Sequence, residues 1–259
     1  MILHRAIVTA VLALAAFPLC AGEVPQSERR SGYGFMSTET KAIQDDDTAN
    51  PGMLWVLDGE ALWNKRQGTA DKACADCHGN AETSMKGAAA RYPAFDAALG
   101  RPVTLEQRIN LERTRHQEAA PLPYESHDLL ALTAFIARQS RGVAISAGDD
   151  PALAPFVAQG RELFMRREGQ LNLACTNCHD DNWGKHLAGS AVTQAQPTGY
   201  PEYRLEWQTL GSLERRLRGC ITGVRAQAYD FGAPELVELE LYLMTRAKGM
   251  NMESPAVRP

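Results

Sequence analysis

The pattern Cys-x-x-Cys-His occurs twice in this chain, at residues 74–78 and 175–179. Two thiols three positions apart on a helical turn can both form thioethers to one porphyrin, and the adjacent histidine then faces the iron as proximal ligand. Zinc sites and disulfides also use paired cysteines, but zinc needs four ligands and the chain has only 6 cysteines. We therefore predict two covalently bound haem c groups. Cys74 and Cys77 would attach the first haem, with His78 as its iron ligand, and Cys175 and Cys178 would attach the second, with His179 as its iron ligand.

The start of the chain has the pattern of an export signal. After a short polar start, an apolar run covers residues 6–19 and ends at Cys20-Ala21-Gly22. Such a run is typical of a cleavable signal peptide and is too short for an ordinary transmembrane helix. Cys20 would also fit a lipid anchor, but Leu19 stands where a lipoprotein signal has a small residue. We expect residues 1–22 to be removed and the mature chain to be a soluble periplasmic protein without membrane insertion.

The net charge excludes some classes of partner, and the cysteine count indicates one further functional residue. Lys and Arg number 27 against 31 Asp and Glu, and loss of Arg5 with the signal makes the balance 26 − 31 = −5. This acidic balance predicts no binding to nucleic acid or to an anionic membrane surface. Once the signal and the four haem thiols are set aside, Cys220 is the single cysteine left. An unpaired thiol is unusual in an oxidising compartment, so Cys220 is a candidate functional residue.

The chain also contains an internal repeat. Three segments recur, the first at an offset of 175 − 74 = 101 and the others at 108 and 107: 58–66 with 159–167, 105–109 with 213–217, and 129–136 with 236–243. Each copy predicts an amphipathic helix before the haem motif, a loop-rich stretch, a middle helix and a closing helix. The closing helices are expected to stop at Gly142 and Gly249.

This order of helices is that of a class I cytochrome c, in which the N- and C-terminal helices cross and short loops wrap the haem. We predict an all-α chain of two tandem class I cytochrome c domains, which fits the usual domain size. A stretch rich in Gly, Asp and Pro at residues 142–155 is the expected linker. The predicted boundaries are a signal peptide at 1–22, an N-terminal arm at 23–57, domain 1 at 58–145 and domain 2 at 146–259.

The internal alignment indicates where the distal iron ligand of domain 2 lies. At the offset of 108, Arg216 falls on Arg108 and Cys220 falls on Glu112. Most free cysteines are small buried hydrophobes, and that interpretation stays open. Against it, Cys220 lies in the expected distal helix downstream of His179, among several arginines. We therefore favour a Cys220 thiolate as ligand, kept ionised by ferric iron and by the neighbouring cations.

Six strings spread over nearly the whole mature chain are more specific than the haem motif. They are Asn-Pro-Gly-Met-Leu-Trp-Val-Leu-Asp-Gly-Glu at 50–60, Pro-Leu-Pro-Tyr-Glu-Ser at 121–126, Arg-Gln-Ser-Arg-Gly at 138–142, Arg-Leu-Arg-Gly-Cys at 216–220, Ala-Pro-Glu-Leu at 233–236 and Glu-Ser-Pro-Ala-Val-Arg at 253–258. In these strings the chain closely resembles the SoxA family, the larger subunits of the sulfur-oxidising SoxAX cytochromes.

The resemblance implies an L-cysteine S-thiosulfotransferase, which oxidatively joins thiosulfate to a cysteine on the swinging arm of the carrier protein SoxYZ. Two electrons would leave through haem to the partner subunit SoxX and onward to a small cytochrome. In the family the second haem is catalytic, with a cysteine persulfide as distal ligand and an essential arginine one turn earlier. Cys220 and Arg216 match these positions. A planar guanidinium suits a sulfur oxyanion, and Arg218 and Arg225 are further candidates to neutralise its charge.

Domain 1 departs from the family pattern. Its haem commonly has a distal cysteine in the family, and the matching residue here is Glu112. Carboxylate is a poor ligand for a low-spin haem, so we predict that His116, one helical turn further on, is the ligand opposite His78. His127 is a weaker candidate because it begins the closing helix, and His186 is expected at the surface. An imidazole in place of a thiolate would raise the potential of the first haem.

Other functions stay open at this point. A plain electron-transfer dihaem cytochrome with His/Met irons needs a methionine after each haem motif. Met244 or Met250 would serve domain 2, but domain 1 offers only Met85, which follows His78 by 85 − 78 = 7 residues. A dihaem peroxidase needs an open iron site with an acid and a base, which no motif marks. A thiosulfate dehydrogenase, which also uses a haem-bound cysteine, would release free tetrathionate instead of a conjugate of the carrier.

Overall fold

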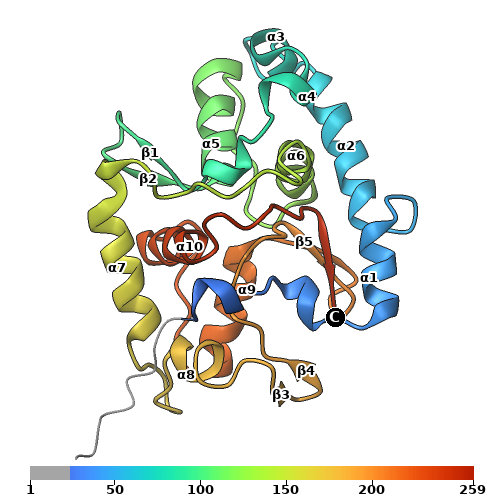
Figure 1. Cartoon of the computed structure of the whole chain (residues 1–259). Helices are drawn as coiled ribbons and strands as arrows, with labels where there is room; N and C mark the ends of the chain where they lie inside the picture. The colour runs from blue at the N-terminus through green and yellow to red at the C-terminus, as the bar shows by residue number, and fades with distance from the viewer. Residues whose placement is uncertain (1–23) are drawn as a thin grey trace, which may run out of the picture.

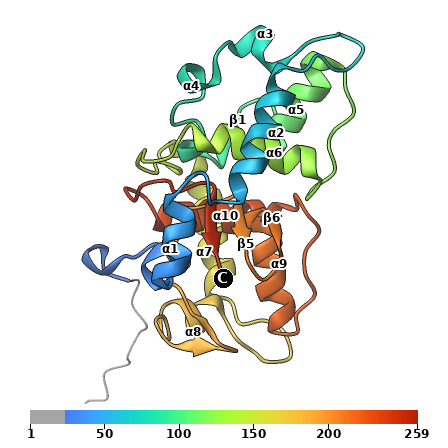
Figure 2. The same cartoon turned by 90° about the vertical axis from the view of Figure 1, so that its right-hand side faces the viewer.

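The computed structural model describes residues 24–259, so the predicted signal peptide and Cys20 lie outside the described residues. Two helical units stack on each other, and the two haem motifs lie toward opposite ends of the molecule (Figure 1 and Figure 2). Among residues 24–259, every helix is too short or too polar to span a bilayer.

Both units follow the predicted order of helices. In domain 1 they are α2 (Gly52–Asn64), the haem-motif helix α3 (Cys74–His78), α4 (Ala81–Ser84), the middle helix α5 (Leu105–Glu112) with a following π-helical turn η4 (Arg113–Gln117), and the closing helix α6 (His127–Arg138). In domain 2 they are α7 (Ala154–Met165), α8 (Cys175–His179), α9 (Leu213–Gly223) and α10 (Pro234–Arg246). Short 3-10 turns are η1 (Gln26–Glu28), η2 (Gly32–Phe35), η3 (Ala89–Arg91) and η5 (Pro151–Leu153).

The first and last helices of each domain cross closely at a glycine. A Cβ on Gly59 would lie 2.1 Å from the carbonyl oxygen of Ala131, and one on Gly160 would lie 2.0 Å from that of Glu238. The two oxygens belong to residues related by the repeat, since 238 − 131 = 107. Only glycine allows this approach of the two backbones. The predicted crossing of N- and C-terminal helices is therefore confirmed in both domains.

The middle helices begin at side-chain caps that the repeat preserves. The Thr104 hydroxyl accepts a hydrogen bond from the Gln107 amide at 3.3 Å, and the Ser212 hydroxyl accepts one from the Arg215 amide at 3.1 Å. Each cap satisfies a donor that the first helical turn leaves free. Because the cap fixes where each helix begins, it also fixes the position of residues two turns later, including Cys220 on α9.

Short strands precede each middle helix, although the sequence predicted helices alone. β1 (Ala94–Asp96) pairs antiparallel with β2 (Arg101–Val103), and β5 (Glu202–Arg204) pairs in the same way with β6 (Thr209–Gly211). β3 (His186–Leu187) and β4 (Ser190–Ala191) form a small hairpin near α8. The C-terminal strand β7 (Ala256–Arg258) adds in parallel to β5, giving the order β6-β5-β7. The chain remains mainly helical, and these hairpins place loops beside the distal helices.

The segment before domain 1 packs against the end of the chain. Its helix α1 (Thr38–Asp45) contacts β7, where the Gln44 side-chain oxygen accepts from the Val257 amide at 3.1 Å. Asp47 binds Arg138 and Arg141 through its two carboxylate oxygens at 2.8 and 2.7 Å. The predicted boundary at residue 58 lies inside α2, six residues after Gly52.

Two groups of buried side chains form the core. The larger one surrounds α2 and α6 and includes Trp63, Leu129 and Phe135; it also reaches Met244 of α10. The smaller one surrounds α7, α9 and α10 and includes Phe164 and Leu217. Each core thus supports one haem motif and one distal helix.

Candidate functional site

Each haem motif forms a single helical turn that begins at its first cysteine. The Asp76 side chain accepts from the Ala73 amide at 3.0 Å, and the Asn177 side chain accepts from the Ala174 amide at the same distance. These bonds hold the start of α3 and α8 and direct both thiols of each motif to one side. All described cysteines are free thiols, and the described residues contain no group of three or more His, Cys, Asp or Glu side chains suited to a metal ion.

The second motif meets the distal helix at Cys220. The Nδ1 atom of His179 hydrogen-bonds with the Thr193 carbonyl oxygen at 2.6 Å, which fixes the ring and leaves Nε2 for a ligand bond. The His179 ring also lies near the Cys220 thiol, close enough to lower its pKa. Cys220 also lies close to the two other thiols of the site. Burial is the main cause that raises the pKa of Cys175 and Cys178, and the nearby charge of Cys220 raises it further.

This donor set suits a c-type haem. Cys175 and Cys178 would provide the two thiols for covalent attachment, and His179 and Cys220 would provide an imidazole and a thiol for the iron. The fold brings these four side chains together from α8 and α9. The predicted pairing of His179 with Cys220 is thus supported by their contact.

Cations around Cys220 favour its thiolate form. Burial alone would raise the pKa of the Cys220 thiol, but the hydrogen bond from His179 and the positive charges of Arg216 and Arg204 outweigh it. The net pKa therefore lies below the usual value for cysteine. A low thiol pKa is typical of a reactive or metal-ligating cysteine.

Arg216 differs from its repeat partner in having no close carboxylate. In domain 1, Arg108 binds Asp96 at 2.7 Å and Glu112 at 3.4 Å. The offset of 108 replaces Asp96 with Arg204 and Glu112 with Cys220 in domain 2. Among residues 24–259, Arg216 forms no ion pair within 4 Å. Burial lowers the pKa of its guanidinium, but the nearby charges of Cys220, Tyr200, Glu202 and Glu206 together raise it above the usual value. The half-buried guanidinium is thus left with donors for an anion.

Arg204 is a functional candidate that sequence reasoning missed. Its guanidinium is buried, contacts Glu202 and Glu206 at 3.4 Å each, and adds positive charge at Cys220. The signal was present in the internal alignment, because the residue at the offset of 108 is the acidic Asp96. The charge of the residue at this position is therefore reversed between the two domains.

A buried ion pair behind His179 was also missed. Arg246 Nη2 donates to Asp180 at 2.5 Å and to the Gln194 carbonyl oxygen at 3.5 Å, and both ion-pair side chains are about 5% exposed. Asp180 follows His179 and Gln194 follows Thr193, so Arg246 holds both sides of the His179 hydrogen bond. The matching residue of domain 1 is the neutral Gln139, since 246 − 107 = 139.

The first motif is surrounded differently. The Trp63 Nε1 atom donates to the Gly79 carbonyl oxygen at 3.1 Å, and its ring lies 5.7 Å from that of His78. The Gln117 amide approaches the Cys74 sulfur at 3.9 Å. Cys74 also lies close enough to Glu112 for that charge to influence its pKa, which burial chiefly raises. Glu112 therefore lies near Cys74 of the first motif, as Cys220 lies near Cys175 and Cys178 of the second.

The predicted histidine ligand of domain 1 lies next to Glu112. His116 is exposed in η4, with Nε2 3.4 Å from a Glu112 carboxylate oxygen. In the described part of the chain, no hydrogen bond or ring contact joins His116 to His78. His127 instead binds Asp58 at 2.9 Å at the surface, and His186 is exposed on β3. His116 stays a prediction for this site.

Known proteins resemble this chain over most of its length. The family model described as "SoxA/TsdA, cytochrome c domain" matches residues 58–145 and again 159–252. The L-cysteine S-thiosulfotransferase subunit SoxA of Pseudaminobacter salicylatoxidans is 40% identical over 235 residues, covering 90% of this chain and 82% of the relative. The subunit of the same name from Rhodovulum sulfidophilum is 38% identical over 231 residues, covering 89% and 80%.

A solved structure confirms the likeness in three dimensions. The crystal structure of SoxXA from P. pantotrophus superposes with a TM-score of 0.86 and 32% sequence identity, covering 89% of this chain and 87% of that chain. The two matches to one cytochrome c domain confirm the repeat and the predicted fold class. This chain therefore belongs to the SoxA family of c-type cytochromes.

Proposed function

We propose that this protein is the SoxA subunit of a periplasmic L-cysteine S-thiosulfotransferase, with covalent haem c at both motifs. The first haem would be held by Cys74 and Cys77, and the second by Cys175 and Cys178. The proposal follows the names of its relatives, which are L-cysteine S-thiosulfotransferase subunits SoxA. The apolar run at residues 6–19 supports export to the periplasm.

The observation that carries this function is the meeting of His179, Cys220 and Arg216. The thiol of Cys220 lies near His179, and Arg216 lies one helical turn away with no carboxylate within 4 Å among residues 24–259. A sulfur nucleophile beside a free guanidinium is the arrangement that a sulfur oxyanion needs. Domain 1 has Glu112 and a neutralised Arg108 in these places, so it lacks both features.

The proposed reaction joins two sulfur atoms. The carrier thiol and thiosulfate form one S–S bond, the thiol releases its proton, and two electrons leave. When bound, the haem of domain 2 supplies the path by which these electrons depart, first to SoxX and then to a small cytochrome. Arg216, with Arg204 behind it, would neutralise the sulfonate end of thiosulfate and direct its terminal sulfur toward Cys220.

The polypeptide would position the remaining groups. The Thr193 carbonyl and the Arg246–Asp180 pair hold the His179 ring in one orientation. Cys220 would act as distal ligand, in the family's persulfide form, and as the site where thiosulfate and the SoxYZ cysteine meet. In domain 1, we propose His78 and His116 as the ligands, with Glu112 as hydrogen-bond partner of His116.

SoxX is the proposed partner subunit. The solved relative is a complex described as SoxXA, and this chain matches the chain compared over nearly its full length. A heterodimer would cover the second haem edge and give electrons a short exit. SoxYZ, with its mobile cysteine arm, is the proposed acceptor of the thiosulfate group.

The methionines argue against a plain electron carrier. Met244 is 6% exposed and belongs to the larger core, and Met250 and Met85 pack against the same core. They are therefore committed to packing beside α2 and α6, whereas Cys220 faces His179. The contact between His179 and Cys220 favours thiolate ligation in domain 2.

The test compares products with thiosulfate, SoxX and SoxYZ all present. We expect a thiosulfate adduct on the carrier cysteine, detected by intact mass, and loss of that adduct in Cys220→Ala. Free tetrathionate without any carrier adduct would identify a thiosulfate dehydrogenase instead. Electron transfer that is unaffected by Cys220→Ala would identify a plain cytochrome.

A further inference from the structure

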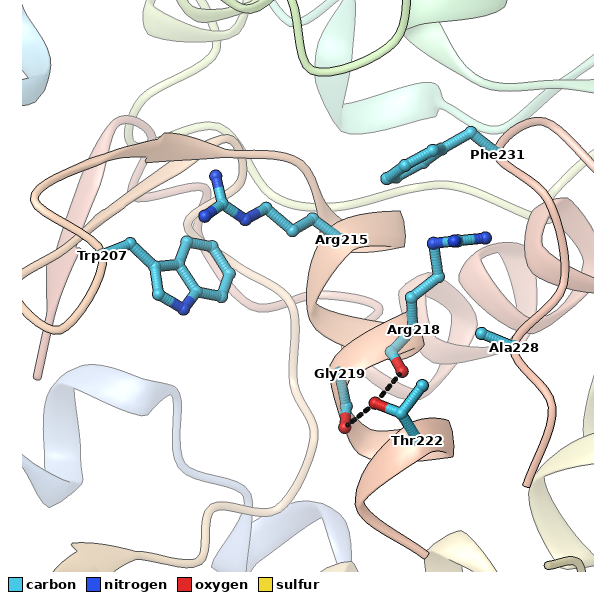
Figure 3. Close-up of a pocket in the computed structure, with 7 residues that line it drawn as sticks. All are labelled: Trp207, Arg215, Arg218, Gly219, Thr222, Ala228 and Phe231. Carbon is cyan, nitrogen blue, oxygen red and sulfur yellow. Dashed lines mark hydrogen bonds between the residues drawn. The ribbon is translucent and has the colours of Figure 1, made fainter. Parts of the chain in front are cut away.

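A cavity of about 310 Å³ opens beside α9 (Figure 3). Arg216 and Cys220, on the same helix, are not among its lining residues. It is lined by Trp207, Arg215, Arg218, Gly219, Thr222, Ala228 and Phe231. Arg215, Arg218 and Thr222 share this face because they are three or four residues apart. The cavity contains two cationic side chains and no acidic one.

Each arginine of the cavity is held by an aromatic ring. The Arg215 guanidinium lies 4.2 Å from the centre of the Trp207 ring, and that of Arg218 lies 4.4 Å from the centre of Phe231. Figure 3 shows the two side chains extending from one helix toward these two rings. A ring covers only the flat face of a guanidinium, so the N–H donors in its plane stay free for an acceptor.

These donors are largely unused. The Nη1 atom of Arg218 is buried without a hydrogen-bond partner among the described residues. The carboxylate nearest to Arg215 is that of Glu125, at 3.8 Å, which is too long for a hydrogen bond. Burial raises the pKa of Glu214, one turn before Arg218, to about 7, so this neighbour is a weak counter-charge near neutral pH.

Domain 1 lacks the two arginines and the tryptophan of the cavity at the matching positions. The offset of 108 places Leu99, Gln107 and Asn110 where domain 2 has Trp207, Arg215 and Arg218. The Asn110 amide both donates to and accepts from the Leu122 backbone, at 2.9 and 2.8 Å, and so closes α5 against its following loop. Arg218 makes no such bond to its loop. The two arginine charges and the Trp207 ring thus occur only in the domain that carries Cys220, whereas Phe231 is matched by Tyr124.

We propose that this cavity is a second oxyanion site, which binds thiosulfate separately from Arg216. Arg215 and Arg218, which extend from one helix face toward Trp207 and Phe231, would supply two positive charges for a dianion, and Gly219 and Thr222 complete this part of the lining. The hydroxyl of Thr222 now donates within the helix, to the Arg218 and Gly219 carbonyl oxygens at 3.0 and 3.1 Å. The choice of a sulfur oxyanion rests on the proposed function. The site would concentrate thiosulfate one helix face away from the reacting sulfur.

The test measures equilibrium binding of radiolabelled thiosulfate to the purified, haem-loaded mature chain without carrier protein. Arg216→Gln serves as the background, because it removes the other proposed anion site. In this background we compare Arg215→Gln and Arg218→Gln with Arg161→Gln, which removes an equal charge from an exposed position on α7. We expect saturable binding to persist in the background, each cavity variant to weaken it about tenfold, and Arg161→Gln to leave it unchanged. Arg218→Lys, which keeps the charge and the fold, should weaken it less.

Two results would overturn the proposal. One is loss of all saturable thiosulfate binding in Arg216→Gln alone. The other is an unchanged affinity for thiosulfate in Arg215→Gln and Arg218→Gln. This holds also if these variants bind SoxYZ more weakly, because the cavity would then contact the carrier protein instead of thiosulfate. Thiosulfate transfer is assayed in parallel. Absence of transfer together with cavity-dependent binding would reject the proposed function while supporting the second site.

Discussion

The ring of Tyr124 stacks on the ring of Phe231, with centroids 5.7 Å apart and planes inclined by 13°. These residues are repeat partners, since 231 − 124 = 107. Equivalent residues of two copies can touch each other only where the copies are related by an approximate two-fold axis. The two domains therefore contact each other through the loops that follow their distal helices. Residues that differ at matching positions can be compared directly between the two domains.

Removal of the Arg216 charge should abolish most of the activity. Arg216→Gln leaves Cys220 and the haem ligands in place but removes the guanidinium proposed for thiosulfate. We expect a loss of about 100-fold or more in kcat/KM for thiosulfate, as for other charge-stabilising donors at reaction sites. The matched control is Arg108→Gln in domain 1, whose guanidinium binds Asp96. That variant should keep wild-type kcat/KM, and an equal loss in both would contradict the role assigned to Arg216.

Arg246 should hold the proximal ligand of the second haem. Arg246→Gln leaves Asp180 as a buried charge without its partner, which costs about 3 kcal/mol of stability. We expect a lower unfolding midpoint in urea and an altered absorption and electron paramagnetic resonance signal of the second haem only. Arg246→Lys should recover part of both. If the haem signals stayed unchanged while stability fell, Arg246 would be structural without positioning His179.

The helix crossings should not tolerate a side chain. Gly160→Ala places a Cβ against the Glu238 carbonyl oxygen, so α7 and α10 must separate. We expect a loss of about 1–3 kcal/mol in unfolding free energy, as for other overpacked sites. Gly223→Ala is the control, because a Cβ there meets no atom within 4 Å. Calorimetry of the two variants should show a lowered midpoint for the first and an unchanged or slightly raised one for the second.

Buried Glu214 should make the stability depend on pH. Burial raises its pKa from 4.5 in the unfolded chain to about 7, so the folded state binds the proton more tightly. Its contribution is complete below pH 4.5 and is lost as the pH rises through 7, with a total of about 3 kcal/mol. Glu214→Gln should remove this fall and be more stable than wild type at pH 8. Parallel curves of unfolding midpoint against pH for the two proteins would contradict the prediction.

The sequence predicted what depends on local pattern and on the repeat. The Cys-x-x-Cys-His spacing that begins at Cys74 and again at Cys175 predicted the two haem-motif helices. Gly59 and Gly160 lie in the helices that were predicted to cross. These features occur in both domains because each domain packs its first helix closely against its last one. The internal alignment at an offset of 108 placed Cys220 in the expected distal helix, and the structure brings it near His179.

What escaped prediction depends on contacts between distant segments. Arg246 lies 66 residues from its partner Asp180, and no periodicity in either segment indicates that they meet. The short strands are too brief to show alternation, and β7 joins β5 only because the chain end returns across domain 2. Arg204 could have been found, because the alignment places it on the acidic Asp96, but its meaning required the position of Cys220. The assignment of His116 as distal ligand of the first haem stays a prediction.

The central claim is that Cys220 is the distal ligand and the reacting sulfur of a thiosulfotransferase. The most direct measurement is the intact mass of the purified periplasmic protein and of its Cys220 peptide, together with thiosulfate-dependent transfer to SoxYZ by wild type and Cys220→Ala in the presence of SoxX. The predicted result is two haem masses, an added sulfur of about 32 Da on the Cys220 peptide, and no transfer in the variant. Two haems with an unmodified Cys220 and full transfer by Cys220→Ala would contradict it.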